Sequence, residues 1–372
     1  MRTLIHDLPG ASAGTTRRLR SLSFGSGQSG RKAYLQASLH ADEVPPMLVA
    51  QALTERLSAL EAAGAIAGEI VLVPMANPIG LAQELQGSAF GRFDLSTGLN
   101  FNRQFKPLTA ALIPLVEAQL GPDMAANTQL IRAACATLLQ AWQPATEAEA
   151  LKRLLQGLAM DADLVLDLHC DNQAVMHLYT GTPQAAAIAP LAGYLGAQAL
   201  LYADVSGDDP FDEAVSRIWW ELAAHFEGRF PIDPLGCLAA TVELRGETEV
   251  SRELAEHDAD ALIAFLRSTG HVDGTPPPQP PGCEATPLQG VEPITATASG
   301  IVIFAKAPGD WVEAGELVAE LIDPLTDART PLHARASGRC FARSSRRYAN
   351  CGMRLMKIAG PTAYRSGKLL SP

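Results

Sequence analysis

The chain has 372 residues, of which 47% are hydrophobic and 19% are charged, and its formal net charge at pH 7 is −11. This composition is typical of a globular protein rather than a disordered one, and the length exceeds that at which one hydrophobic core usually stops growing, so we expect two domains. The acidic balance argues against a nucleic-acid partner, because neutralising phosphates requires clustered Lys and Arg.

Targeting and redox signals are also informative. The sequence contains no run of about eighteen apolar residues that could span a membrane, and no uninterrupted apolar stretch of signal-peptide length near its start. We therefore expect a cytoplasmic protein without a membrane partner. The six cysteines are scattered without a CxxC pair, which is typical of reduced thiols and argues against a thiolate zinc site.

The N-terminal part of the chain begins with strand patterns. Residues 17–24 (RRLRSLSF) alternate polar and apolar side chains, turn through GSGQSG at 25–30 and continue as an apolar strand from 33 to 39, which predicts a β-hairpin. The turn matches GxGxxG, but a dinucleotide-binding fingerprint needs a strand before it and a helix after it. A helix over 46–62 is expected next, with Pro45 and Pro46 in its first turn.

Further elements alternate between strand and helix. We expect a buried strand over 70–75, a long loop over 81–107, helices over 108–120, 125–142 and 147–160, a strand over 164–168, helices near 184–200 and 211–226, a strand around 238–244 and a helix over 252–267. This alternation predicts an α/β domain over residues 1–270, with a mostly parallel mixed sheet and helices on both faces.

The C-terminal part shows a proline-rich segment followed by short strand patterns. The proline-rich segment 271–287 predicts a stiff extended linker, because proline supplies no amide hydrogen. From 291 to 358, short Val/Ile/Ala runs are broken by Ser-Gly, Pro-Gly and Ala-Gly turns, which predicts a small all-β sandwich-like domain over 288–372.

Two predicted strands end in histidine. His40 follows LQASL, His169 follows LVLDL, and Glu43 lies three residues after His40. The carboxyl ends of parallel strands meet at one sheet edge, where open α/β folds hold their ligands. A lone histidine after a strand is more often a surface or core residue. Two histidines and a carboxylate with an open fourth position form a known hydrolytic zinc set, so the coincidence favours a metal site.

Two further carboxylates are candidates for roles near this site. Asp167 points to the same side of its strand as His169, so it could orient that imidazole or else cap a neighbouring helix. Glu243 lies inside the apolar strand TVELRGE, where a carboxylate is costly unless it is paired or used. Beside a metal-activated water it would be the general base; the alternative is a salt bridge with Arg245 or another cation.

The long loop carries candidate substrate-binding residues. Asn102 and Arg103 combine an amide donor with a guanidinium suited to a carboxylate, and Arg92 lies ten positions earlier. Single arginines are most often solvated surface charges. Two in a weakly charged loop suggest an anionic substrate.

Four motifs together resemble the succinylglutamate desuccinylase/aspartoacylase family, a branch of the zinc-carboxypeptidase superfamily. They are HADE at 40–43, GLNFNR at 98–103, DLHCDN at 167–172 and VELRGE at 242–247, and the resemblance covers about residues 30–270. It implies a zinc-carboxypeptidase-like catalytic domain. It also implies one zinc per chain bound by His40, Glu43 and His169, with Glu243 activating water.

The resemblance further implies that Arg92 polarises the scissile carbonyl and that Asn102 and Arg103 hold a substrate carboxylate. The leading hypothesis is a zinc-dependent amidohydrolase that deacylates an N-acylated amino acid or a similar small carboxylate, acting on amide bonds rather than primarily on esters. The alternative from the same chemistry is a metallocarboxypeptidase acting on short peptides. A homo-oligomer is compatible with either.

The stretch GIVIFAKAPGDWVEAGELVAEL at 300–321 resembles a biotinyl/lipoyl-carrier sandwich. Carriers attach their cofactor to a lysine at a hairpin tip, and the corresponding stretch LIDPLTDARTPLHA has no lysine. A third hypothesis, a non-catalytic carrier or binding protein, is therefore disfavoured. We expect the domain to be a lid, a spacer or an oligomer contact.

Overall fold

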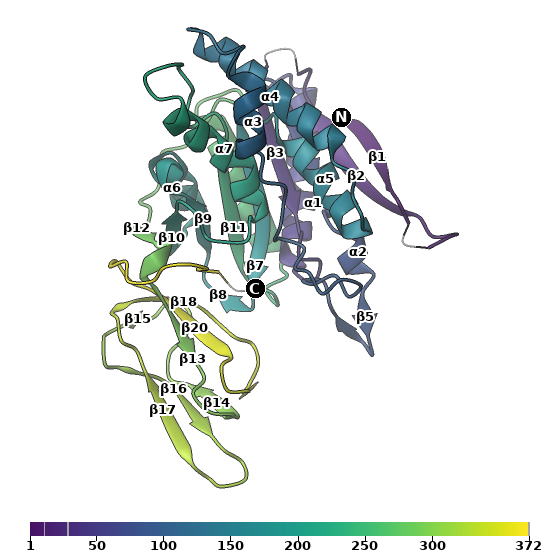
Figure 1. Ribbon diagram of the computed structural model, residues 1–372. Helices are drawn as coiled ribbons and strands as arrows, with labels where there is room; N and C mark the ends of the chain where they lie inside the picture. Colours follow the sequence, from purple (N-terminus) through teal and green to yellow (C-terminus); the bar gives the residue numbers. More distant parts are fainter. Residues whose placement is uncertain (11, 28–29, 371–372) are drawn as a thin grey trace.

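The large sheet is the framework of the molecule (Figure 1). The computed structural model describes residues 1–10, 12–27 and 30–370. In them, nine strands pair in the order β1-β2-β4-β3-β7-β11-β9-β10-β12. Their bounds are β1 Arg2–Leu8, β2 Arg17–Phe24, β3 Lys32–Ala37, β4 Glu69–Val73, β7 Leu164–Asp171, β9 His177–Gly181, β10 Ala199–Ala203, β11 Leu238–Gly246 and β12 Ala285–Pro287.

The centre of this sheet is parallel and sets where the candidate site lies. β3 pairs in parallel with β7, with Ala33 opposite Leu164, and β7 pairs in parallel with β11, with Leu164 opposite Leu238. All three strands are buried along most of their length, as expected for strands covered on both faces. Because they run side by side in register, their carboxyl ends meet at one edge.

Helices cover both faces of the sheet (Figure 1). One hydrophobic cluster joins the sheet to α1 Pro45–Ala62, α6 Ala185–Leu195 and α8 Arg252–Ser268. The other joins it to α3 Thr109–Val116, α4 Met124–Ala141, α5 Glu147–Ala159 and α7 Phe211–His225. The expectation of a mixed α/β fold is confirmed. Within the described ranges, no helix is both long and apolar enough to cross a membrane.

The predicted hairpin between residues 17–24 and 33–39 is wrong. β2 pairs antiparallel with β1 and β4, whereas β3 pairs in parallel with β4 and β7. After β3, the chain passes through α1 and returns as β4. β4 pairs with the edge of β3 at which β2 would have paired in a hairpin, so β4 lies between β2 and β3. Residues 28 and 29 of the predicted turn lie outside the described residues.

The single helix predicted near 184–200 is instead three elements. A 3₁₀ turn, η1 Thr182–Gln184, leads into α6, which ends at Leu195, and β10 follows from Ala199. Gly196 ends the helix because it adopts a left-handed conformation, with φ 64°, and its amide returns to the last turn. The predicted loop 81–107 likewise contains a short hairpin, β5 Glu84–Leu85 with β6 Ser88–Ala89, after the short helix α2 Pro78–Leu81.

Residues 291–359, named here the β region, form two smaller sheets around a hydrophobic cluster of their own. The strands are β13 Val291–Thr295, β14 Gly300–Phe304, β15 Trp311–Val312, β16 Leu317–Ile322, β17 Arg329–His333, β18 Gly338–Arg343, β19 Tyr348–Ala349 and β20 Arg354–Ala359. The β region joins the rest of the molecule through β8 Gln173–Ala174, which continues from β7 and pairs with β18 (Figure 1).

The packing of α8 predicts a stability effect. Leu262 on α8 is fully buried in the cluster that also contains α1 and α6. Leu262→Ala should lower the free energy of unfolding by about 2–5 kcal/mol, because it leaves a cavity. Urea denaturation followed by circular dichroism measures this. The control is Leu115→Ala, at a side chain that is 44% exposed, which should change the same free energy by less than about 0.5 kcal/mol. Equal effects would contradict the assignment of the core.

Candidate metal and substrate site

A tight turn after β3 presents His40 and Glu43. Ser38 takes a left-handed conformation, with φ 58°, and its hydroxyl donates to the Glu43 carbonyl at 2.6 Å. The Glu43 amide in turn donates to the His40 carbonyl at 3.1 Å. α1 then begins at Pro45, where proline sacrifices no helical hydrogen bond. The turn therefore holds both side chains at the carboxyl edge of the sheet.

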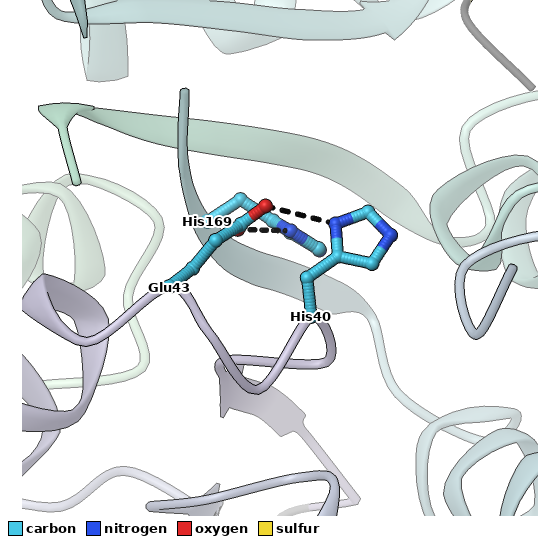
Figure 2. A group of neighbouring side chains, drawn as sticks. All are labelled: His40, Glu43 and His169. Atoms are coloured by element: carbon cyan, nitrogen blue, oxygen red, sulfur yellow. Dashed lines mark hydrogen bonds and ion pairs between the residues drawn. The ribbon is translucent and has the colours of Figure 1, made fainter. Parts of the chain in front are cut away.

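His169, near the end of β7, completes a cluster with this pair (Figure 2). One oxygen of Glu43 lies 2.9 Å from Nδ1 of His40, and the other lies 2.8 Å from Nδ1 of His169. All three side chains are at most 5% exposed. One ligand atom from each residue lies within 4.8 Å of the others, so the three could share one metal ion.

The remaining nitrogen of each imidazole also has a hydrogen-bond partner. Nε2 of His40 lies 2.8 Å from the Asn100 side-chain oxygen, and Nε2 of His169 lies 3.0 Å from Asp167. The second oxygen of Asp167 accepts from Gln36 at 2.9 Å. If each Nε2 carries the proton of its outer hydrogen bond, the Nδ1 lone pair of each imidazole would be available to a cation shared with Glu43. Outer hydrogen bonds of this kind orient metal-binding histidines, so the donor set fits a divalent ion such as zinc.

The pKa shifts of Glu43, His40 and His169 are compatible with a bound cation. Burial opposes ionisation of Glu43, but His169 and His40 together hold its pKa well below the usual value. Burial and the nearby Arg92 lower the pKa of His40 to about 4, whereas Asp167 and Glu43 outweigh burial and raise the pKa of His169. A cation bound beside Glu43 would displace the proton that Asp167 and Glu43 hold on His169.

Glu243 lies one strand away, on β11, directly opposite His169 in the strand register. Its Oε2 atom is buried without a hydrogen-bond partner in the described part of the chain. Burial, reinforced by the charges of Glu43 and Asp171, raises the pKa of Glu243 to about 8. The alternative of a salt bridge with Arg245 is wrong, because Arg245 pairs with Asp258.

A cavity of about 340 Å³ opens beside the cluster. Six predicted site residues line it: His40, Arg92, Asn102, Arg103, His169 and Glu243. Glu43 does not line the cavity, but Arg92 donates to its carboxylate at 2.8 Å. The structure therefore brings all seven predicted site residues to one place.

The loop residues Asn102 and Arg103 form hydrogen bonds within the protein. The Asn102 side-chain oxygen accepts from the Phe211 amide at 2.9 Å, and its nitrogen lies 3.4 Å from Nε2 of His169. Arg103 donates to the Asn102 carbonyl at 2.7 Å and lines the cavity near Asp212. Asn102 is thus fixed, and Arg103 forms part of the cavity wall.

A lid was one of the roles expected for the C-terminal part of the chain, but sequence reasoning named none of the β-region residues that line this cavity. Lys357 on β20 forms an ion pair with Asp171 at 2.5 Å, and both residues line the cavity. Burial raises the pKa of Asp171, but Lys357 reverses the effect and brings it to about 2. Arg343 and Arg354 line the same cavity. These residues follow the DLHCDN motif by more than 170 positions, and no local pattern marks them.

Comparisons with known proteins agree with the motifs. A family model described as the succinylglutamate desuccinylase/aspartoacylase catalytic domain matches residues 29–269, which is more than half of the chain. The chain belongs to this family. The family is one of deacylases, so its membership supports hydrolase chemistry. No curated protein matches the sequence.

Solved structures extend the likeness over nearly the whole chain. Two proteins named after the same family, from Shewanella frigidimarina NCIMB 400 and Shewanella amazonensis SB2B, superpose with TM-scores of 0.86 and 0.83 at 22% and 24% identity. Both matches cover 96% of this chain, and 97% and 98% of theirs. The product-bound ectoine utilization protein EutE (DoeB) from Ruegeria pomeroyi gives 0.68 at 17%, covering 96% and 94%. At these identities the likeness establishes the fold alone.

The outer hydrogen bonds of the histidines predict a measurable effect on metal binding. Asp167→Asn should weaken zinc affinity by about 10–100-fold, because the His169 imidazole loses the charged group that orients it. Competition with a chromophoric chelator measures the affinity. Asp161→Asn, at a carboxylate that is 57% exposed, serves as the control and should bind zinc as the unaltered protein does. Unchanged affinity in the Asp167 variant would contradict this arrangement.

Proposed function

We propose that the protein is a zinc-dependent amidohydrolase that removes the acyl group from an N-acylated amino acid or a similar small molecule bearing a carboxylate. The observation that carries this proposal is the buried His40–Glu43–His169 cluster beside a cavity that also contains Glu243. Two imidazoles and a carboxylate leave the remaining coordination positions of a zinc ion open for chemistry. Family membership supports the same class of reaction.

In the proposed mechanism, His40, Glu43 and His169 hold the metal. When bound, zinc would lower the pKa of water and polarise the substrate carbonyl. Glu243 takes a proton from the attacking water and passes it to the amine nitrogen as the carbon–nitrogen bond breaks. The raised pKa of Glu243 suits a group that must both accept and release a proton near neutral pH.

We assign two arginines to interactions with the substrate, one with its carbonyl oxygen and one with its carboxylate. The Arg92 guanidinium, one of whose nitrogens is bonded to Glu43, stabilises the negative charge that develops on the carbonyl oxygen. Arg103 holds the substrate carboxylate, because it lines the cavity and its planar guanidinium matches a carboxylate. Asn102 supports this loop by accepting a hydrogen bond from the Phe211 amide.

The rival function, cleavage of short peptides by a metallocarboxypeptidase, has less support. The β region contributes Arg343, Met356 and Lys357 to the cavity wall, so this side of the site is covered. The cavity volume of about 340 Å³ suits a small molecule better than an extended peptide. Turnover of a panel of N-acyl amino acids beside short peptides distinguishes the two, and turnover of peptides alone would overturn the proposal.

The role of Glu243 gives the central test. Glu243→Gln should lower kcat by about 10²–10⁴-fold, because the amide has no basic oxygen for the proton. Its zinc content, measured by atomic emission, should stay at about one ion per chain. As the comparison variant, His169→Ala should lose both zinc and activity. Activity that survives removal of zinc by a chelator would contradict the mechanism.

A further inference from the structure

One segment of the β region carries an unusual concentration of positive charge. The chain has a net charge of −11, yet residues 343–347 read RSSRR, with three arginines in five positions. We name residues 343–347 the basic loop. It joins β18 to β19, and its first two residues, Arg343 and Ser344, line the cavity that contains the His40–Glu43–His169 cluster.

The basic loop is fixed against the segment that follows the strand of His169. Arg343 and Arg347 both donate to the same side-chain oxygen of Gln173, at 2.8 and 3.0 Å. The hydroxyl of Ser345 hydrogen-bonds to Glu247. Gln173 directly follows Asn172, which lines the cavity. The loop therefore lies in a defined position beside the cavity, with Arg343 and Ser344 in the cavity wall.

The two guanidinium groups are held close together although they carry the same charge. They lie over the Phe304 ring, with centroid distances of 4.9 Å for Arg343 and 5.1 Å for Arg347. Their other acceptors are neutral backbone carbonyls. In the part of the chain that the structure describes, no carboxylate is within ion-pair distance of either. Burial and the charge of Arg347 lower the pKa of Arg343.

Such an arrangement has an energetic cost unless an anion relieves it. Like charges repel, and the repulsion is stronger where a charge is partly buried, as Arg343 is, than where it is exposed, as Arg347 is. Stacking on Phe304 and the shared Gln173 oxygen offset the repulsion, and Arg343 brings the positive charge to the cavity wall. A positive potential at the entrance of a cleft raises the local concentration of anions and discriminates against neutral molecules.

We propose that the basic loop is a specificity element that selects anionic substrates for the cavity that it adjoins. This inference rests on the proposed function and extends it to the β region, outside the segment that the family model matches. The loop acts on binding, because Arg343 lies in the cavity wall and Arg347 lies over the same Phe304 ring as Arg343. The bond-breaking groups, Glu243 and Arg92, belong to the catalytic part of the chain.

The test compares two substitutions of Arg347 in the full-length, zinc-loaded protein. Arg347→Gln removes the charge but retains a donor for Gln173, and should raise the KM for an anionic N-acyl amino acid about 3–10-fold at low salt, with a much smaller change in kcat. Arg347→Lys keeps the charge and should restore most of the KM. The KM for the neutral C-terminal amide of the same substrate should be unchanged by either substitution.

A matched control and a salt series complete the experiment. Arg329→Gln removes an equal charge from a different strand of the β region, β17, and should leave the KM unchanged. For Arg347→Gln, the difference from the unaltered protein should shrink in 0.5 M NaCl, because salt screens exposed charges. Equal losses in the Gln and Lys variants, an equal effect on the neutral substrate, or an equal effect of Arg329→Gln would overturn the proposal.

Binding of succinate, measured by calorimetry, separates this inference from the proposed function. If no N-acyl amino acid is hydrolysed but Arg347→Gln still weakens succinate binding in a salt-dependent way, the loop recognises anions and the deacylase assignment fails. If hydrolysis occurs but Arg347→Gln changes neither the KM nor succinate binding, the deacylase assignment stands and the loop has no part in specificity.

Discussion

The carboxylate of Glu43 is the point at which two distant parts of the chain meet. Each of its oxygens faces one imidazole, from His40 on its own turn and from His169 on β7. The backbone amide of Cys170 and the guanidinium of Arg92 also donate to it, at 3.0 and 2.8 Å. A buried carboxylate loses several kcal/mol of hydration free energy. These donors compensate for that loss and keep the group ionised where a cation can bind.

This geometry depends on the register of the parallel strands beneath it. Gln36 on β3 lies directly opposite Asp167 on β7, and their side chains are hydrogen-bonded. Tyr34 donates to Gln36, and Asp167 accepts from His169, so a buried polar chain connects the middle of the sheet to the site. If the pairing register of β7 slipped by one residue, every side chain of β7 would turn to the other face of the sheet, and His169 would be separated from His40. The apolar strands therefore set the positions of the ligands through their pairing.

The sequence predicted what depends on short-range pattern. Helices α1, α4, α5 and α8 follow from apolar periodicity and helix propensity. The convergence of His40 and His169 followed from one rule, that parallel strands end at a common edge. The predicted hairpin failed because strand pairing is not local: β4, which follows α1, pairs with both β2 and β3. Lys357 could not be anticipated, because its ion pair with Asp171 joins residues 186 positions apart.

The attachment of the β region has a consequence for the site itself. β7 carries His169 and ends at Asp171, and the chain then continues directly into β8. Lys357 binds Asp171, Arg343 binds Gln173, and the Val175 amide donates to the Phe341 carbonyl at 2.9 Å. The chain leaving the His169 strand is therefore held by the β region at three successive points. The β region thus has a structural role at the site, because it forms one wall of the cavity and fixes the segment that continues from a candidate metal ligand.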